Sequence, residues 1–469
     1  MNEDRDRLSN YVVASNHLNV LRSGFKGYLL YSTRTGKVRT VGAATWEQLN
    51  RDRITELPPE TRNELRRAGI LVSTSEDELS VVLDENQRAI EEHDVLYQVV
   101  QPSAWCQLDC GYCGQVHQRA SLSIELQTAF LERVRKRLAS GRYKHLRIGW
   151  FGAEPLVGIG VIRTLTPALR KLAIMNNCDF GARIVTNGLA LTPAMAIELT
   201  TKLSISEAEI TLDGTAPYHD LLRPTKKGRD SFKRIFTNVV AVLQQTSLGL
   251  VIRCNVGQDN VNAVSPLLQA LYDAGVAKKV RFYTSPVYSW GNDAHKTALT
   301  PERYAEAELE WLALQFRLGF EVGLLPQRRP IVCMAVQREA EVLDAHGNSF
   351  NCTEVPYVPT YGEPSIYAIR FIRSAAAVPG PAAFPSVPTA PGSVRTGRGD
   401  PAGRLASFND QIRSGEQAPC RSCKMLPVCG GQCPKAWHER HEPCPSAKTN
   451  IVQRLDMLLA MNQLAHLLT

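Results

Sequence analysis

Apolar and polar positions follow two alternating periods over residues 95–325 of this chain. Short apolar runs typical of buried strands recur at 96–101, 145–150, 182–186, 208–212, 248–256 and 280–283. Between them, apolar residues three or four positions apart predict amphipathic helices, including 123–138, 192–203, 230–243, 261–274 and 301–316. Repeated strand–helix units predict an α/β fold with a parallel sheet and helices outside it.

The first 90 residues have a different pattern. A hairpin is predicted from two apolar-rich strands around a short turn, and two helices and a further strand follow it. The predicted elements are 27–32, 36–41, 44–49, 59–68 and 70–72.

Residues from about 326 to 469 make up a third predicted region. Residues 375–401 are dense in Pro, Gly, Ala and Ser, which is typical of a flexible insertion. Apolar spacing at 451–468 predicts a closing helix. We therefore expect three domains, at 1–90, 95–325 and 326–469.

Composition narrows the class of protein. The chain has 469 residues, of which 44% are hydrophobic, so a substantial core is expected. It has no run of 18 apolar residues, and its charged first residues do not read as a signal peptide, so we expect a cytoplasmic protein without a membrane span. A net charge of +8 accompanies no nucleic-acid motif, so no nucleic-acid partner is expected.

Three cysteines lie just after the first strand of the central region with the spacing C-x3-C-x2-C: Cys106, Cys110 and Cys113. Thiolates so spaced can hold three irons of a [4Fe–4S] cube and leave the fourth iron open to a small molecule. A zinc loop is the alternative, and it requires a fourth thiol or imidazole nearby. His117 is the only candidate, and we expect it to start the next helix.

Seven of the 12 cysteines lie beyond residue 330. They are Cys333, Cys352, Cys420, Cys423, Cys429, Cys433 and Cys444. Disulfides fit poorly with a chain that lacks a signal peptide, whereas zinc stays an alternative for this block. Cys178 and Cys254 match no motif and are expected to be ordinary buried thiols.

The first cysteine loop resembles the signature of the radical S-adenosylmethionine (SAM) enzymes, in which SAM fills the open iron site. This resemblance implies a partial (βα)6, TIM-like barrel with the cluster at the carboxyl ends of its strands. It also implies SAM contacts from Gly152, Ala153 and Glu154, which correspond to the family's Gly-Gly-Glu-Pro. Ala153 replaces a glycine there, so a positive φ at this position would add strain.

Further positions match the family at successive strand ends. Tyr112 matches an aromatic residue that lies against adenine, and Thr211 a residue that bonds the ribose. Arg223 matches an arginine that pairs with the SAM carboxylate through its fixed fork of donors. The run Thr-Asn-Gly at 186–188 ends the third strand as in the family. Arg253 and Asn255 on the fifth strand either face the cavity or bond within the barrel.

The cysteines of the third region resemble the SPASM extension of peptide-modifying radical SAM enzymes. The resemblance implies one auxiliary [4Fe–4S] cluster held by Cys333, Cys352 and Cys433. A second set would hold the other auxiliary cluster: Cys420, Cys423, Cys429 and Cys444. Some relatives have an eighth cysteine, and residues 334–351 contain none. The first auxiliary cluster thus has either an open iron or a ligand other than cysteine.

By resemblance, the chain is expected to cleave SAM reductively and to abstract hydrogen from a peptide or protein. The N-terminal region is similar to winged-helix elements that bind leader peptides, and a domain that only covers the barrel is the other interpretation. The expected partners are a precursor peptide and a reductant such as ferredoxin or flavodoxin. The preferred reaction is the formation of a thioether or carbon–carbon crosslink in a ribosomally made peptide.

Two other functions stay open. Formylglycine formation in a sulfatase is the first, and it is disfavoured because Thr353 stands where such relatives have an Asp base. The second is a zinc-stabilised peptide-binding module without catalytic activity.

Overall fold

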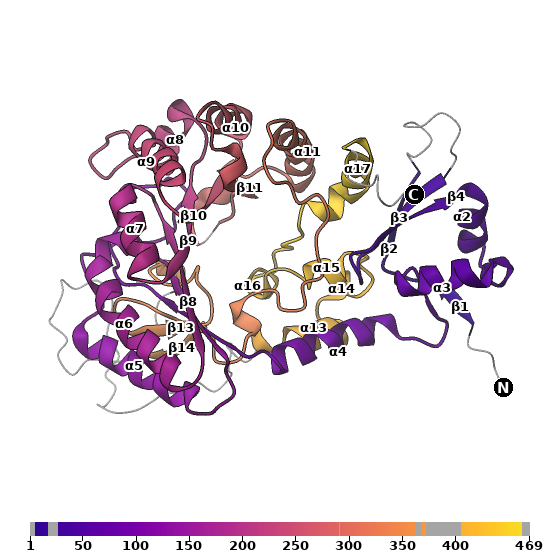
Figure 1. Ribbon diagram of the computed structural model, residues 1–469, viewed down its shortest axis with the longest axis horizontal. Coiled ribbons are helices and arrows are strands. Elements are labelled where there is room, and N and C mark those ends of the chain that lie inside the picture. The colour runs from indigo at the N-terminus through magenta and orange to yellow at the C-terminus, as the bar shows by residue number, and fades with distance from the viewer. Residues whose placement is uncertain (1–4, 17–26, 290, 362–366, 372–404, 462–469) are drawn as a thin grey trace.

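The structure is a computed structural model, and it describes residues 5–16, 27–289, 291–361, 367–371 and 405–461. Figure 1 shows the central α/β region on one side and the N-terminal elements on the other, with the C-terminal helices between them. The predicted insertion at 375–401 and the end of the predicted closing helix lie outside the described residues.

A mixed sheet of nine strands forms the centre of the molecule. Its strand order is β11-β10-β9-β8-β7-β6-β12-β13-β14. The first six in this order are mutually parallel, as predicted. They are β6 (Val95–Val100), β7 (His145–Trp150), β8 (Asp179–Thr186), β9 (Ile205–Thr211), β10 (Gly249–Val256) and β11 (Val280–Pro286). The six predicted strands are confirmed, with ends that shift by up to three residues.

Helices cover the outer face of this sheet. They are α5 (Ile124–Leu138), α6 (Ile159–Met175), α7 (Pro193–Thr201), α8 (Ala216–Leu222), α9 (Phe232–Gln245), α10 (Val264–Asp273) and α11 (Pro301–Arg317). The pattern analysis left out α6, which contains Pro167, and the short α8. Among the described helices, none combines the length and apolar character needed to cross a bilayer.

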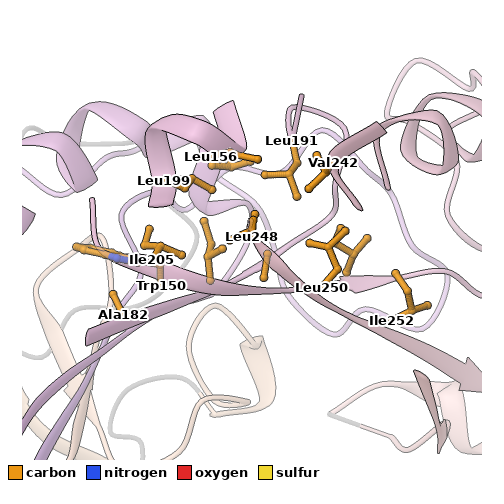
Figure 2. Packing of buried hydrophobic residues seen from close by; sticks show 14 of the residues in the cluster. Trp150, Leu156, Ala182, Leu191, Leu199, Ile205, Val242, Leu248, Leu250 and Ile252 are labelled. Atoms are coloured by element: carbon orange, nitrogen blue, oxygen red, sulfur yellow. The ribbon is translucent and has the colours of Figure 1, made fainter. Parts of the chain in front are cut away.

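The main core fills the space between the sheet and these helices. Figure 2 shows buried side chains of the strands, such as Ile205 and Leu250, directed at side chains of the covering segments, such as Leu199 and Val242. The residues that alternate with these along each strand face inward. Alternation along each strand thus separates an apolar outer face from the inner face that lines the candidate site.

The barrel stays open because the first strand pairs with a strand from the C-terminal region. β12 (Glu341–Leu343) runs parallel to β6, and β13 (Asn348–Phe350) and β14 (Ala368–Phe371) continue the sheet antiparallel. Within the described strands, β6 and β11 are therefore opposite edges of the barrel portion and do not pair. No strand beyond residue 326 was predicted, because three- and four-residue strands carry almost no periodic signal.

Short helices dominate the rest of the C-terminal region. They are α13 (Phe408–Ser414), α14 (Ala418–Arg421), α15 (Leu426–Cys429), α16 (Pro434–His438) and α17 (Ala447–Ala460). The predicted closing helix corresponds to α17, which begins four residues earlier than expected.

The N-terminal region contains two small antiparallel sheets. One pairs β1 (Asp6–Leu8) with β5 (Leu71–Ser73), and the other orders β2 (Val12–Ser15), β3 (Gly27–Ser32) and β4 (Val38–Gly42). The helices are α2 (Ala43–Asn50), α3 (Pro59–Arg67) and α4 (Glu78–Glu91). The predicted hairpin and two helices are confirmed, whereas β1, β2 and α4 were missed. The winged-helix comparison stays a prediction.

The N-terminal sheet packs directly on the cysteine-rich region. Leu29 and Tyr31 of β3 share one apolar cluster with Val428, Cys429 and Ile451. The Thr33 hydroxyl also donates to the Lys424 carbonyl at 2.6 Å. In Figure 1, α4 runs alongside α13, which it contacts. A deletion of residues 1–90 would uncover this apolar face, so it cannot report on peptide recognition alone.

Leu29 tests this packing. It is fully buried, so Leu29→Ala should lower the free energy of unfolding by about 2–5 kcal/mol through lost burial and a residual cavity. Ile174→Ala is the control, because Ile174 is 71% exposed on α6. Chemical denaturation of both variants measures the difference. Equal stabilities would show that the two regions do not support each other.

Candidate active site

The three-cysteine loop joins β6 to α5 and is fixed by the end of α8 and the residues that follow it. The backbone N–H groups of Asp109 and Gly111 donate to the carbonyls of Pro224 and Leu222, at 2.8 and 3.0 Å. Asn292 Nδ2 donates to the Tyr112 carbonyl at 2.9 Å. These bonds hold the loop at the carboxyl end of β6, where active sites of parallel barrels are found.

Cys106, Cys110 and Cys113 are brought together in this loop. Burial, with Glu154 and Cys110 nearby, raises the pKa of Cys106 to about 12. Burial also raises the pKa of Cys110 to about 11, where Arg223 opposes the rise and Cys113 adds to it. Burial also raises the pKa of Cys113, and the nearby Cys106 adds to it. Because metal ligation requires thiolates, binding of iron must displace protons from these cysteines.

His117 does not start a helix. It lies in the extended segment before α5, whose N-cap is Ser123. The expectation was wrong because the Ser123 side chain, which accepts from the Leu126 N–H, supplies the helix start. Burial lowers the pKa of His117 to about 4, so its imidazole is neutral at pH 7.

A buried hydrogen-bond network stands behind the loop. The Tyr112 hydroxyl donates to Asp213 Oδ2 at 2.5 Å, and it accepts from Asn255 Nδ2 at 3.0 Å and from Arg223 Nη1. Arg223 Nη1 lies 3.7 Å from Asp213 Oδ2. Arg253 Nε donates to Asn255 Oδ1 at 2.8 Å. Arg253 and Asn255 therefore bond within the barrel, and Asn255 also reaches the network.

Asp213 is the anion of this network, and Arg223 is its cation. Burial raises the pKa of Asp213, while Arg223 and the Tyr112 hydrogen bond oppose that rise. Within the described structure, Arg223 Nε is buried and has no hydrogen-bond partner. One guanidinium donor thus stays available to a ligand carboxylate, which is the role that the family resemblance implies.

Glu154 lies at the end of the second barrel strand and is fully buried. Its carboxylate accepts from Thr186 Oγ1 and Asn187 N, both at 2.7 Å, and from Leu156 N at 2.9 Å. Asn187 Nδ2 in turn donates to Gln107 Oε1 at 3.0 Å, and it lies 3.6 Å from Cys106 Sγ. A carboxylate has about four acceptor positions, so one is left for a ligand ammonium.

Gly152 and Ala153 form the turn before Glu154. Their φ angles are +81° and +44°, so Ala153 has the left-handed conformation that was expected to add strain. A Cβ at Gly152 would lie 2.2 Å from Cδ of Gln101, so only glycine fits there. Thr211 is buried as the last residue of β9. The predicted SAM contacts therefore meet around the cysteine loop, and their roles stay predictions.

The remaining cysteines fall into the two predicted groups. One group, with Lys448 beside it, lines a single pocket: Cys420, Cys423, Cys429 and Cys444. In the other group, Cys433 and Cys333 both raise the pKa of Cys352, after burial and Glu354. Cys178 and Cys254 are buried, as expected.

In the part of the chain that the structure describes, no three His, Cys, Asp or Glu side chains stand close enough to hold one metal ion. The iron–sulfur and zinc interpretations of these cysteines both stay predictions.

The barrel interior contains a cavity of about 150 Å³. Its lining combines charged groups (Arg183, Glu207 and Glu209) with Val99 and with Thr353 from the C-terminal region. The lining therefore places charged side chains inside the barrel.

Two residues of the site were missed from the sequence. His219 is fully buried, its Nδ1 accepts from Asp213 N at 3.2 Å, and its Nε2 bonds Ser231 Oγ at 3.1 Å. It belongs to the same run as Arg223, four residues earlier. Gln101, whose amide lies over Gly152, follows β6 directly, and no sequence motif marked it as a site residue.

The fold defined by these observations is an open (βα)6 barrel with a cysteine loop after its first strand and a cysteine-rich C-terminal region. It is similar to the solved structure of anSMEcpe with bound AdoMet, with a TM-score of 0.54 and 15% identity over 80% of this chain and 100% of that chain. For anSMEcpe with AdoMet and Kp18Cys peptide the TM-score is 0.55, at 14% identity over 79% and 99%. These matches confirm the predicted α/β fold with a parallel sheet and a cysteine-rich C-terminal region.

A weaker likeness joins the chain to SuiB of Streptococcus suis bound to precursor peptide SuiA. Its TM-score is 0.46, at 12% identity over 93% of this chain and 98% of that chain. No protein-family model and no curated protein sequence matches the chain.

His219 predicts a pH dependence of stability. Burial lowers its pKa from 6.5 to about 3 in the folded chain, so below pH 6.5 the unfolded chain binds a proton that the folded chain does not. The free energy of unfolding should therefore fall as pH drops, with a slope that approaches about 1.4 kcal/mol per pH unit. From pH 7 to pH 5.5, the free energy of unfolding should fall by about 1 kcal/mol less in His219→Gln than in the wild type. Chemical denaturation of both proteins at the two pH values measures this difference. Equal falls would contradict this assignment.

Proposed function

We propose that this chain is a radical SAM enzyme that installs a thioether or carbon–carbon crosslink in a ribosomally made peptide. The observation that carries the proposal is the group of three thiols, Cys106, Cys110 and Cys113, at the carboxyl end of the first barrel strand. These three thiolates would hold a [4Fe–4S] cluster, which when reduced would supply the electron for reductive cleavage of SAM.

The chain's own groups would bind and orient SAM. Arg223 has a buried Nε donor to spare for the carboxylate, and its Nη1 is held by the Tyr112 hydroxyl and lies 3.7 Å from Asp213 Oδ2. Glu154 has an acceptor position left for the ammonium, and Thr211 stands at the end of β9 for the ribose. Tyr112 is held by its hydroxyl, so its ring is fixed within the cysteine loop.

The other cysteine groups would hold two auxiliary clusters. Cys333, Cys352 and Cys433 would hold one of them. Cys333 and Cys352 pack against the apolar cluster that contains Val99 of β6, so a group held there would be placed to accept an electron from the substrate. The second group packs against the N-terminal sheet, because Cys429 belongs to the same apolar cluster as Leu29 and Tyr31. This position suits a route for electrons to or from a ferredoxin or flavodoxin.

A peptide is the proposed substrate. anSMEcpe has been solved with Cp18Cys peptide bound, and its fold is shared here with a TM-score of 0.53. The polar barrel cavity and the N-terminal region would receive the modified residue and the leader. Formylglycine formation is the second candidate, and Thr353 in the cavity lining counts against it, because a hydroxyl is a poor general base.

Metal content and SAM cleavage test the cluster assignment. Protein purified without oxygen should contain about 12 irons, four for each of three clusters. Cys110→Ala should abolish 5′-deoxyadenosine formation with dithionite, since the cluster loses a ligand. Cys178→Ala is the control, because Cys178 lies outside all three groups, and it should retain activity. Undiminished 5′-deoxyadenosine from Cys110→Ala, or stoichiometric zinc in place of iron, would refute the assignment.

Product mass tests the type of modification. After co-expression with its precursor, the peptide should be lighter by two hydrogens. Tandem mass spectrometry should show no backbone fragments between the joined residues, because a crosslink keeps both pieces together. A full fragment series with an aldehyde at one Ser or Cys would instead support formylglycine formation.

A further inference from the structure

Gln101 is the first residue after β6, five positions before the cysteine loop. Its backbone N–H donates to the Leu343 carbonyl of β12 at 2.8 Å, which fixes its place at the strand end. Its side chain is fully buried. Gln101 therefore lies where β6, β12 and the cysteine loop meet.

The amide of Gln101 is unsatisfied. Among the described residues, neither Nε2 nor Oε1 has a hydrogen-bond partner. Other buried amides of the site are bonded: Asn187 to Gln107, Asn255 to Tyr112, and Asn260 to two carbonyl oxygens. A buried amide without partners destabilises the folded chain, so its retention points to a bound ligand.

The Gln101 side chain faces the inside of the barrel. Tyr97 and Val99 line the interior cavity, and alternation along β6 puts Gln101 on the same face, nearer the mouth. A Cβ at Gly152 would lie 2.3 Å from Gln101 Nε2, so the amide rests on the backbone of Gly152. This turn leads into Glu154, the residue proposed for the SAM ammonium.

We propose that Gln101 binds the amino-acid end of SAM, in addition to the residues that the family resemblance assigns. A neutral amide both donates and accepts, so it matches an end group that presents a carboxylate and an ammonium side by side. This inference rests on the proposed function, because it concerns the same site.

Gln101→Met tests the inference, since methionine keeps the length and removes both polar atoms. Cluster-loaded protein is titrated anaerobically with SAM alone, without peptide, and binding is followed by equilibrium dialysis and by the cluster EPR signal. Because Gln101→Met would lose hydrogen bonds to charged groups of SAM, its affinity for SAM should be ten- to hundredfold weaker than that of the wild type. The melting temperature of the cluster-free chain should stay equal or rise, because an unsatisfied buried amide is removed.

Gln127→Met is the matched control. Gln127 is a buried amide on α5 with an unpartnered Oε1, and it lies outside the site. It should bind SAM as the wild type does.

Three results would overturn the inference alone. They are an unchanged SAM affinity in Gln101→Met, an equal loss in Gln127→Met, and a higher KM for peptide with unchanged SAM affinity, which would assign Gln101 to the substrate. Failure of the wild type to bind SAM would refute the proposed function, and this inference with it.

Discussion

The ion pair of Asp213 and Arg223 is the interaction on which the rest of the site depends. Both side chains are buried, so each charge needs the other and the Tyr112 hydroxyl to offset its desolvation. Tyr112 belongs to the cysteine loop, Asp213 follows the fourth barrel strand, and Arg223 follows α8. One polar group thus ties three distant segments into a fixed frame around Cys106, Cys110 and Cys113.

Much of the fold could be predicted from the sequence, because the barrel repeats a strong local signal. Six strands with alternating helices appeared in the pattern of apolar residues, and all six strands are present. Cysteine spacing also predicted which thiols lie together, and the structure brings Cys106, Cys110 and Cys113 together in one loop. Glu154 and Arg223 were found because short runs around them resemble motifs of a known family.

Other features depend on contacts between distant segments, which no local pattern records. The pairing of β12 with β6 joins residues more than 240 positions apart. The packing of Leu29 against Val428 and the unsatisfied amide of Gln101 are likewise visible only after folding. His219 is an intermediate case. It lies in the sequence run that was singled out for Arg223, but only the structure shows that its Nδ1 accepts from the Asp213 backbone N–H.

The parallel pairing of β6 with β12 also decides how the chain can be divided for expression. A fragment that stopped near residue 325 would leave β6 with a row of unpaired N–H and C=O groups along its outer edge. Such an edge recruits strands from other chains, and a truncated barrel would aggregate instead of folding alone. The segment that contains β12 is therefore an integral part of the scaffold, and an expressed fragment of the barrel should include it.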